Sequence, residues 1–196
     1  MGKSTTSSGR ESAVPRGAAA LVDLLNSRAF ATVPDELDTP REAAAVLRPF
    51  RQGDCEAAPS SEQIALVREI RGTLLNLVSE SSPEELARHW SALSAQTATA
   101  LFRQRFTGPD GAPQQQQVAG DLVTGGIVQA VAALTGDGNW SRLRLCANTL
   151  CGVAFYDTSR SRTGRWHSYD ACGNRSNVAA YRARRHAPLR DGASSQ

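Results

Sequence analysis

Several residue types and patterns are scarce in this chain of 196 residues, and each scarcity excludes a class of protein. No apolar run reaches the roughly 18 residues that a bilayer-spanning helix needs, so a membrane protein is not expected. The first residues, MGKSTTSSGRESAVPRG, lack the hydrophobic region of a secretory signal, which predicts a cytoplasmic protein with reduced cysteines. Aromatic residues make up only 6% of the chain, and this composition fits an ordinary helical globular protein.

Signatures of the common enzyme classes are also missing from residues 16–141. This part has no nucleophile elbow, no dinucleotide-binding glycine pattern and no H-E-x-x-H motif. Its acidic residues are scattered, and several lie at expected helix starts, where the helix dipole accounts for them. The sequence therefore predicts that the protein is not an enzyme, although a ligand pocket within this part is left open.

Residues 16–139 are expected to form a helical domain. Apolar residues at helical spacing predict helices at 18–30, 40–47, 60–79, 83–98 and 121–136, and capping signals mark the starts of the second, third and fourth. Gly125 and Gly126 weaken the last of these predictions, because glycine is a poor helix former. The alternating stretch ALFRQRF, a turn at 108–111 and PQQQQVA predict a β-hairpin over 100–118.

The charge is unevenly distributed along the chain. Lys3 is the only lysine, and residues 142–190 hold ten arginines against Asp157 and Asp170, a net charge of +8. Residues 1–141 have a net charge of −4. Positive charge segregated onto one end suggests an anionic partner such as nucleic acid. Alternatively, these arginines form a solvated face or dock onto the acidic front part.

The basic segment also contains three of the four cysteines. Cys146, Cys151, His167 and Cys172 have the spacing C-x4-C-x15-H-x4-C, two short-spaced pairs separated by a hairpin-length gap. Thiolates and imidazole are the ligands that zinc prefers, and four protein ligands leave no open position for a substrate. The pattern predicts one structural Zn²⁺ on which the folding of the segment depends. The fourth cysteine, Cys55, is expected to be a free thiol.

Residues 140–187 are expected to form a zinc finger of the treble-clef type, a β-hairpin followed by a helix. Asp170 is predicted to cap a helix that begins near residue 171 and places the Cys172 thiolate in its first turn. On this helix Arg175, Arg182 and Arg185 fall within an arc of roughly 80° beside a face of small residues. Residues 1–15 and 188–196 are expected to be disordered tails.

These residues resemble a known family, the CGNR zinc finger. Its name is the tetrapeptide Cys172-Gly173-Asn174-Arg175, and the C-x4-C pair, Arg165-Trp166 and the YRARR stretch at 181–185 also match. Upstream, the LNSR stretch at 25–28 and the helix-hairpin-helix order resemble the ABATE domain, which usually precedes this finger.

The resemblance implies a bacterial transcription regulator, of a kind sometimes described as stress-induced, with zinc in the finger and DNA as its partner. The third ligand in this family is often cysteine. Histidine stands in its place at His167, which makes metal retention sensitive to acid because the imidazole must be neutral to bind.

The leading interpretation is a zinc-dependent DNA-binding regulator whose helical part acts as a sensor or dimerisation domain. The expected DNA contacts are five arginines of the basic segment: Arg165, Arg175, Arg182, Arg184 and Arg185. A homodimer, and a small-molecule or protein effector on the helical part, are left open. The alternative is a zinc-stabilised module that binds a protein or ligand without touching DNA, and a catalytic zinc is disfavoured by the four-ligand set.

Overall fold

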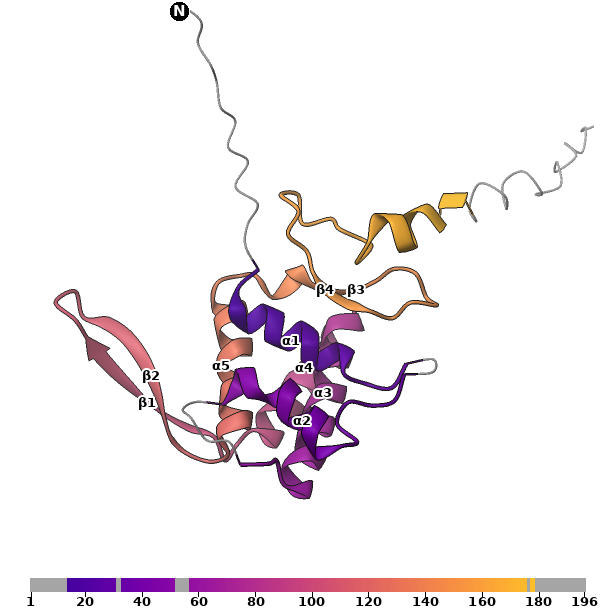
Figure 1. The fold of residues 1–196 in the computed structure, drawn as a ribbon. Coiled ribbons are helices and arrows are strands. Elements are labelled where there is room, and N and C mark those ends of the chain that lie inside the picture. The colour runs from indigo at the N-terminus through magenta and orange to yellow at the C-terminus, as the bar shows by residue number, and fades with distance from the viewer. Residues whose placement is uncertain (1–13, 31–32, 52–56, 176, 179–196) are drawn as a thin grey trace, which may run out of the picture.

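The structure is a computed structural model that describes residues 14–30, 33–51, 57–175, 177 and 178. Within these residues the chain forms five α-helices and two separate antiparallel hairpins (Figure 1). In chain order the elements are α1 (Arg16–Asn26), α2 (Pro40–Leu47), α3 (Ser61–Ser79), α4 (Pro83–Gln96), β1 (Leu101–Thr107), β2 (Ala112–Ala119), α5 (Leu122–Gly136), β3 (Leu143–Leu145) and β4 (Ala154–Tyr156). The predicted fold class, mainly helical with small hairpins, is confirmed.

Three of the helices begin at side-chain caps. Thr39 accepts a hydrogen bond from the backbone N–H of Glu42 at 3.3 Å, and Ser60 accepts one from Gln63 at 3.2 Å. Asp121 caps α5 through the N–H of Thr124 at 2.8 Å. Each cap satisfies a backbone donor that the first turn leaves unpaired. The predicted helix starts are therefore correct to within a few residues.

The hydrophobic core lies between α1, α3 and α5 and continues into the second hairpin. Its fully buried residues include Leu21, Leu24, Leu25, Leu47, Val67, Ile70, Leu74, Val123 and Ile127. Leu143 of β3 and Ala154 of β4 belong to the same buried cluster. The sequence predicts a domain boundary near residue 140, and apolar contacts run across that point.

The glycine pair in α5 has a packing role. A Cβ atom on Gly126 would lie 1.9 Å from the carbonyl oxygen of Phe50, at the end of the 3-10 turn Arg48–Phe50. Only glycine permits this approach of the two backbones. The gain from packing the helix onto this turn offsets the lower helix propensity that weakened the prediction for 121–136.

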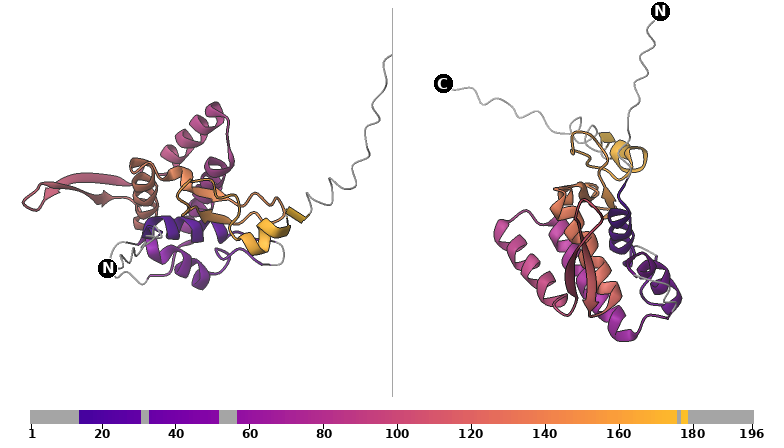
Figure 2. Two further views of the ribbon diagram at one scale, coloured as in Figure 1. Left: turned by 90° about the horizontal axis from the view of Figure 1, so that it is seen from above. Right: turned by 90° about the vertical axis from the view of Figure 1, so that its left-hand side faces the viewer.

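The hairpin of β1 and β2 projects from the helical body (Figures 1 and 2). Its register pairs Arg103 with Gln116 and Arg105 with Gln114, and most of its side chains are exposed. Phe106 is 74% exposed. At the base, Gln117 Nε2 donates to the carbonyl of Asp121 at 2.9 Å, which ties the hairpin to the start of α5.

A buried ion pair holds the segment that follows α1. The guanidinium of Arg71, on α3, pairs with the carboxylate of Asp35 and donates to Ser27 Oγ at 2.8 Å. Arg71 and Ser27 are buried, and the Asp35 side chain is only 16% exposed. Burial alone would raise the pKa of Asp35, but the hydrogen bonds from Arg71 and from the Leu37 N–H, with the charge of Arg71, lower it below its ordinary value.

None of the helices in the described parts of the chain has the length and hydrophobicity to span a lipid bilayer.

The buried pair makes a specific contribution to stability. Arg71→Met is expected to lower the free energy of unfolding by about 3–5 kcal/mol, because it leaves the Asp35 carboxylate without its partner. Arg68→Met is the matched control, since the pair of Arg68 with Asp38 is exposed and such pairs contribute about 0–1 kcal/mol. Urea denaturation at pH 7 measures the free energy of unfolding of both variants. Equal losses in the two variants would contradict a specific contribution of the buried pair.

The ion pair of Arg71 with Asp35 also makes the free energy of unfolding depend on pH. Since the folded-state pKa of Asp35 is depressed, its contribution is fully present above the unfolded-state pKa of roughly 3.9. That contribution is lost as the pH falls through the folded-state pKa. Asp35→Asn should therefore flatten the loss of stability between neutral and acidic pH, measured by urea denaturation at each pH.

Candidate metal centre

Four side chains from two separate stretches converge near the C-terminal end of the described chain. The ligand atoms of Cys146, Cys151, His167 and Cys172 all lie within 4.8 Å of one another, and Cys151 Sγ is 3.3 Å from His167 Nδ1. In the part of the chain that the structure describes, this is the one group of three or more potential ligands with such spacing. All four sequence-predicted ligands are thus brought together.

The spacing of these atoms fits a metal ion. Zn–S and Zn–N bonds of normal length place the ligand atoms of a tetrahedral site about 3.5–3.8 Å apart. The three cysteines are not in disulfides, and two of them, Cys146 and Cys172, are buried. The four residues could therefore hold a metal ion with a closed set of protein ligands, which leaves no position for a substrate.

The first cysteine pair sits on the turn that joins β3 to β4. The N–H of Cys146 donates to Val153 at 2.8 Å, which extends the ladder of the hairpin by one step. Asn148 then closes the turn: its carbonyl accepts from the N–H of Cys151 at 2.8 Å, and its side chain accepts from Leu150. Asn148 Nδ2 also lies 3.5 Å from Cys172 Sγ, so this side chain links both halves of the site.

The second pair lies on the segment that ends in a helical turn. The N–H of Ala147 donates to the carbonyl of Arg165 at 2.8 Å, which sets this segment beside the first turn. A π-type turn follows at Tyr169–Gly173. Its cap is Ser168, whose Oγ accepts from the N–H of Ala171 at 3.2 Å, so the predicted cap at Asp170 is wrong. The turn begins two residues before the expected start, and Asp170 lies inside it.

Gly173 of the CGNR tetrapeptide is required by close packing. A Cβ atom there would lie 2.8 Å from Tyr169 Cδ2 and 3.0 Å from Trp166 Cδ1. Any side chain would push the turn away from these two rings. The glycine therefore keeps Cys172 at its distance from the other ligands.

The surroundings of the thiols favour a bound cation. Burial raises the pKa of Cys146, but hydrogen bonds from His167 and from the backbone N–H of Asn148 outweigh it and lower that pKa to about 7. Burial, together with hydrogen bonds to Cys172 and Cys146, raises the pKa of Cys151 to about 11. Closely spaced thiols resist losing several protons at once, and a cation at their centre removes that penalty. The donor set thus fits a thiophilic metal.

The loop between the two ligand pairs is held by a buried carboxylate whose structural role was not predicted from the sequence. Asp157 is 3% exposed, and it accepts hydrogen bonds from the N–H groups of Ser159 at 2.9 Å and Gly164 at 2.7 Å. Arg142 donates to the carbonyls of Asp157 and Ser159, at 2.7 and 3.0 Å. Arg144 donates to the carbonyl of Gly164 at 3.0 Å. These two arginines are structural, although the charge count treated all ten alike.

The end of α1 supports the first cysteine pair directly. Asn26 donates to the carbonyl of Ala154 at 2.9 Å and accepts from its N–H at 2.7 Å, as a neighbouring strand would. Arg28 donates to the carbonyl of Gly152, the residue after Cys151. Both belong to the LNSR stretch, which stood out in the sequence only for its family resemblance and had no predicted structural role.

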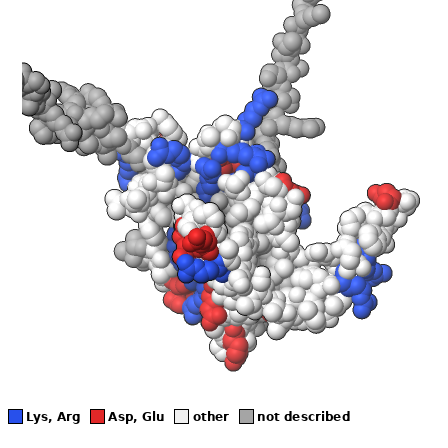
Figure 3. Space-filling view, turned by 180° about the vertical axis from the view of Figure 1, so that it is seen from behind, with Lys and Arg blue, Asp and Glu red and all other residues white. Residues whose placement is uncertain are grey.

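The predicted DNA-contacting arginines have different placements. Arg165 and Arg175 are exposed, and the Arg165 guanidinium stacks on the Trp166 ring at 5.1 Å from its centroid. Arg182, Arg184 and Arg185 lie outside the described residues, as does Cys55. On the face shown in Figure 3, basic side chains gather at the upper end of the molecule and most acidic ones lie lower.

The ligand assignment predicts which substitutions remove metal. His167→Ala and Cys172→Ser should each reduce the bound zinc of the purified protein well below one ion per chain, because three ligands hold it less tightly. His89→Ala and Cys55→Ser are matched controls for the two residue types and should retain it. Metal content is measured by mass spectrometry. The assignment would be contradicted if the control variants lost as much zinc as the two ligand variants.

Metal removal should loosen only part of the chain. Residues 146–151 and 165–173 are expected to exchange amide hydrogens at least about tenfold faster after chelation, because the metal crosslinks them. The helices α1, α3 and α5 should be unaffected, since β3 and β4 pack on the core through Leu143 and Ala154. Hydrogen exchange of the whole chain, with and without chelator, measures this. Unfolding of the entire chain, or no change, would overturn the expectation.

Sequence comparison points to the same segment. Among curated proteins none matches the chain. Residues 142–185 match the family model of the CGNR zinc finger, a stretch that includes all four ligand positions. By this match the segment is similar to the CGNR zinc finger, and the ABATE resemblance of the helical part stays a prediction.

Proposed function

We propose that this protein is a zinc-dependent DNA-binding regulator. One Zn²⁺ at the four-ligand centre would crosslink the two halves of the finger and hold exposed arginines in a fixed arrangement. The observation that carries the proposal is that the four ligand atoms converge within 4.8 Å in the same segment that contains the excess of arginine. The match to a zinc finger family supports it.

The metal is zinc in this proposal because of the donor set. Three thiolates and one imidazole in a closed site favour Zn²⁺ over metals that prefer oxygen ligands. A closed site has a structural role, so the protein is proposed not to be an enzyme. Reduced thiols are required to hold the metal, so a reducing compartment such as the cytoplasm is part of the proposal.

DNA is the proposed partner because of the arginines that the fold leaves available. Arg160, Arg165 and Arg175 are exposed and make no ion pair with an acidic residue in the described parts of the chain. Exposed guanidinium groups are well suited to phosphate oxygens. Arg142 and Arg144 are excluded, since they are engaged with backbone carbonyls of the finger. The helical part is proposed to act as a sensor or a dimerisation domain.

DNA binding by the zinc-loaded chain should weaken steeply with salt. Four or five phosphate contacts give a slope of log affinity against log salt of roughly −4, at about −0.9 per contact. Arg175→Ala should reduce the magnitude of this slope by about one contact. Fluorescence anisotropy with a labelled duplex, over a range of salt concentrations, measures the slope.

Arg103→Ala is the control for this experiment. Arg103 is an equally exposed arginine, but it lies on the projecting β1–β2 hairpin. The Arg103→Ala variant should bind DNA with the affinity and salt dependence of the unchanged protein. Equal losses for Arg103→Ala and Arg175→Ala would indicate a general charge effect, and absence of binding with zinc present would favour a protein- or ligand-binding module.

A further inference from the structure

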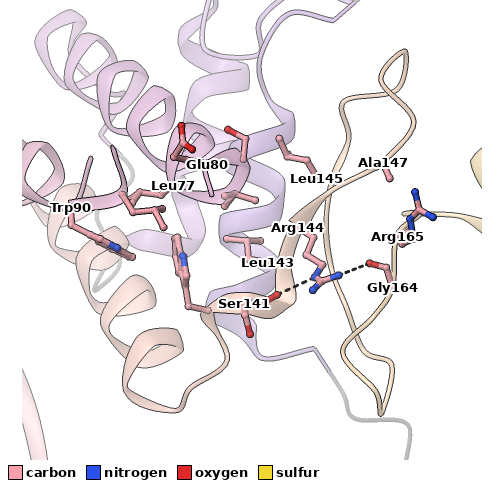
Figure 4. A pocket seen from close by; sticks show the side chains of 14 residues that line it. Leu77, Glu80, Trp90, Ser141, Leu143, Arg144, Leu145, Ala147, Gly164 and Arg165 are labelled. Carbon is pink, nitrogen blue, oxygen red and sulfur yellow. Dashed lines mark hydrogen bonds between the residues drawn. The ribbon is translucent and has the colours of Figure 1, made fainter. Parts of the chain in front are cut away.

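A groove lies between the helical part and the zinc-finger segment. One wall is formed by the end of α3 and by α4, and the other by β3 and residues 164–165 (Figure 4). Its volume is about 580 Å³, within the range of small-molecule sites. The groove is distinct from the metal centre, whose four ligands do not line it.

The floor of the groove is apolar and aromatic. The rings of Trp90 and Trp140 lie 5.1 Å apart between centroids at an angle of 57°, and both residues are only half-buried. Leu77, Leu86 and Leu143 complete this surface. Indole faces left partly open to solvent are a favourable surface for a flat apolar group, because its burial removes apolar area from water.

The rim of the groove carries a net positive charge. Arg144 is held in place by hydrogen bonds to the carbonyls of Ser141 at 3.1 Å and Gly164 at 3.0 Å. Arg165 is exposed and stacks on Trp166. Figure 4 shows both arginines on the finger side and Glu80 on the helical side. The Glu80 carboxylate accepts from the N–H groups of Ser81 and Ser82, at 2.6 and 2.7 Å, which fix it.

We propose that this groove binds a small organic monoanion, an aromatic carboxylate or a similar flat apolar acid. Its apolar body lies on Trp90 and Trp140, and its carboxylate faces Arg165, while Arg144, held on the carbonyls of Ser141 and Gly164, adds positive charge beside it. Arg144 and Arg165 together with Glu80 leave one net positive charge at the groove, which favours a single negative charge on the ligand. Glu80 disfavours a second acid group at the helical end.

Because of where the groove lies, binding of such a ligand would affect how the finger segment is held on the helical part. Arg165 is two residues from His167, and Trp90 lies on α4, so one ligand contacts both the helical part and the segment that carries a metal ligand. A ligand that binds this arrangement better than a loosened one stabilises it. This consequence rests on the proposed function, whereas the binding itself does not.

The test uses 2-naphthoate as the probe and the full zinc-loaded chain. The indole N–H signals of Trp90 and Trp140 should shift in a ¹⁵N-correlation titration, and binding should be about tenfold weaker for neutral 2-naphthamide and for 2,6-naphthalenedicarboxylate. Absence of these shifts, or equal binding of the three compounds, would overturn the proposal.

Variants distinguish binding in the groove from a general effect of the positive charge of the chain. Arg165→Gln should weaken naphthoate binding about tenfold, and Glu80→Gln should strengthen it a few-fold. Arg160→Gln is the control, an exposed arginine of the same segment that does not line the groove, and it should bind like the unchanged chain. Equal effects of the two arginine variants would contradict the assignment.

DNA affinity is measured on the same samples with and without naphthoate. Naphthoate binding without any DNA binding would leave this inference standing and remove the proposed function. DNA binding without naphthoate binding would overturn this inference and leave the proposed function standing.

Discussion

The paired hydrogen bonds between Asn26 and Ala154 set the position of the metal centre on the helical body. A side-chain amide here takes the place of a third strand, because it both donates to and accepts from the backbone of β4. The next residues continue the contact: Ser27 is bound by Arg71, and Arg28 reaches the carbonyl of Gly152. The end of α1 thus connects a buried ion pair in the core with the turn that carries Cys151. A change that displaces this segment affects both.

This arrangement alters what the metal is required to do. The folding of an isolated finger would depend on metal binding, because so short a segment buries little apolar surface. In this chain Leu143 and Ala154 lie in the main core, so the hairpin has support of its own. A metal at this centre would therefore have a narrower role, which is to join the turn at 146–151 to the segment at 165–173. Those stretches meet otherwise through few bonds, such as that between Ala147 and Arg165.

The four candidate metal ligands and the helix starts could be read from the sequence because their signals are local or chemically specific. Paired cysteines and a histidine at such short spacings are typical of zinc sites in a reducing compartment. Thr39, Ser60 and Asp121 each accept from a backbone N–H three residues away. These positions therefore depend little on the rest of the fold.

Asn26 and Asp157 could not be predicted in the same way. The role of Asn26 depends on a backbone group far away in the sequence, for which no spacing rule exists. Asp157 accepts from Ser159 two residues on, which is an ordinary Asx turn, but its contact with Gly164 depends on how the loop folds. The cap at Ser168 was missed because both Ser168 and Asp170 are suitable residues. The structure selects Ser168, whose Oγ accepts from the N–H of Ala171.

The arginines show most clearly why charge alone is an incomplete guide. Arg142 and Arg144 hold carbonyls of the loop that Asp157 closes, and they are half-buried. Arg165 is exposed, yet it lies at the groove between finger and helices and on the Trp166 ring. A guanidinium in that position suits an anion in the groove and a phosphate outside it by the same chemistry. Its charge alone therefore does not decide which anion it binds, because its neighbours in the groove and on the finger surface contribute as well.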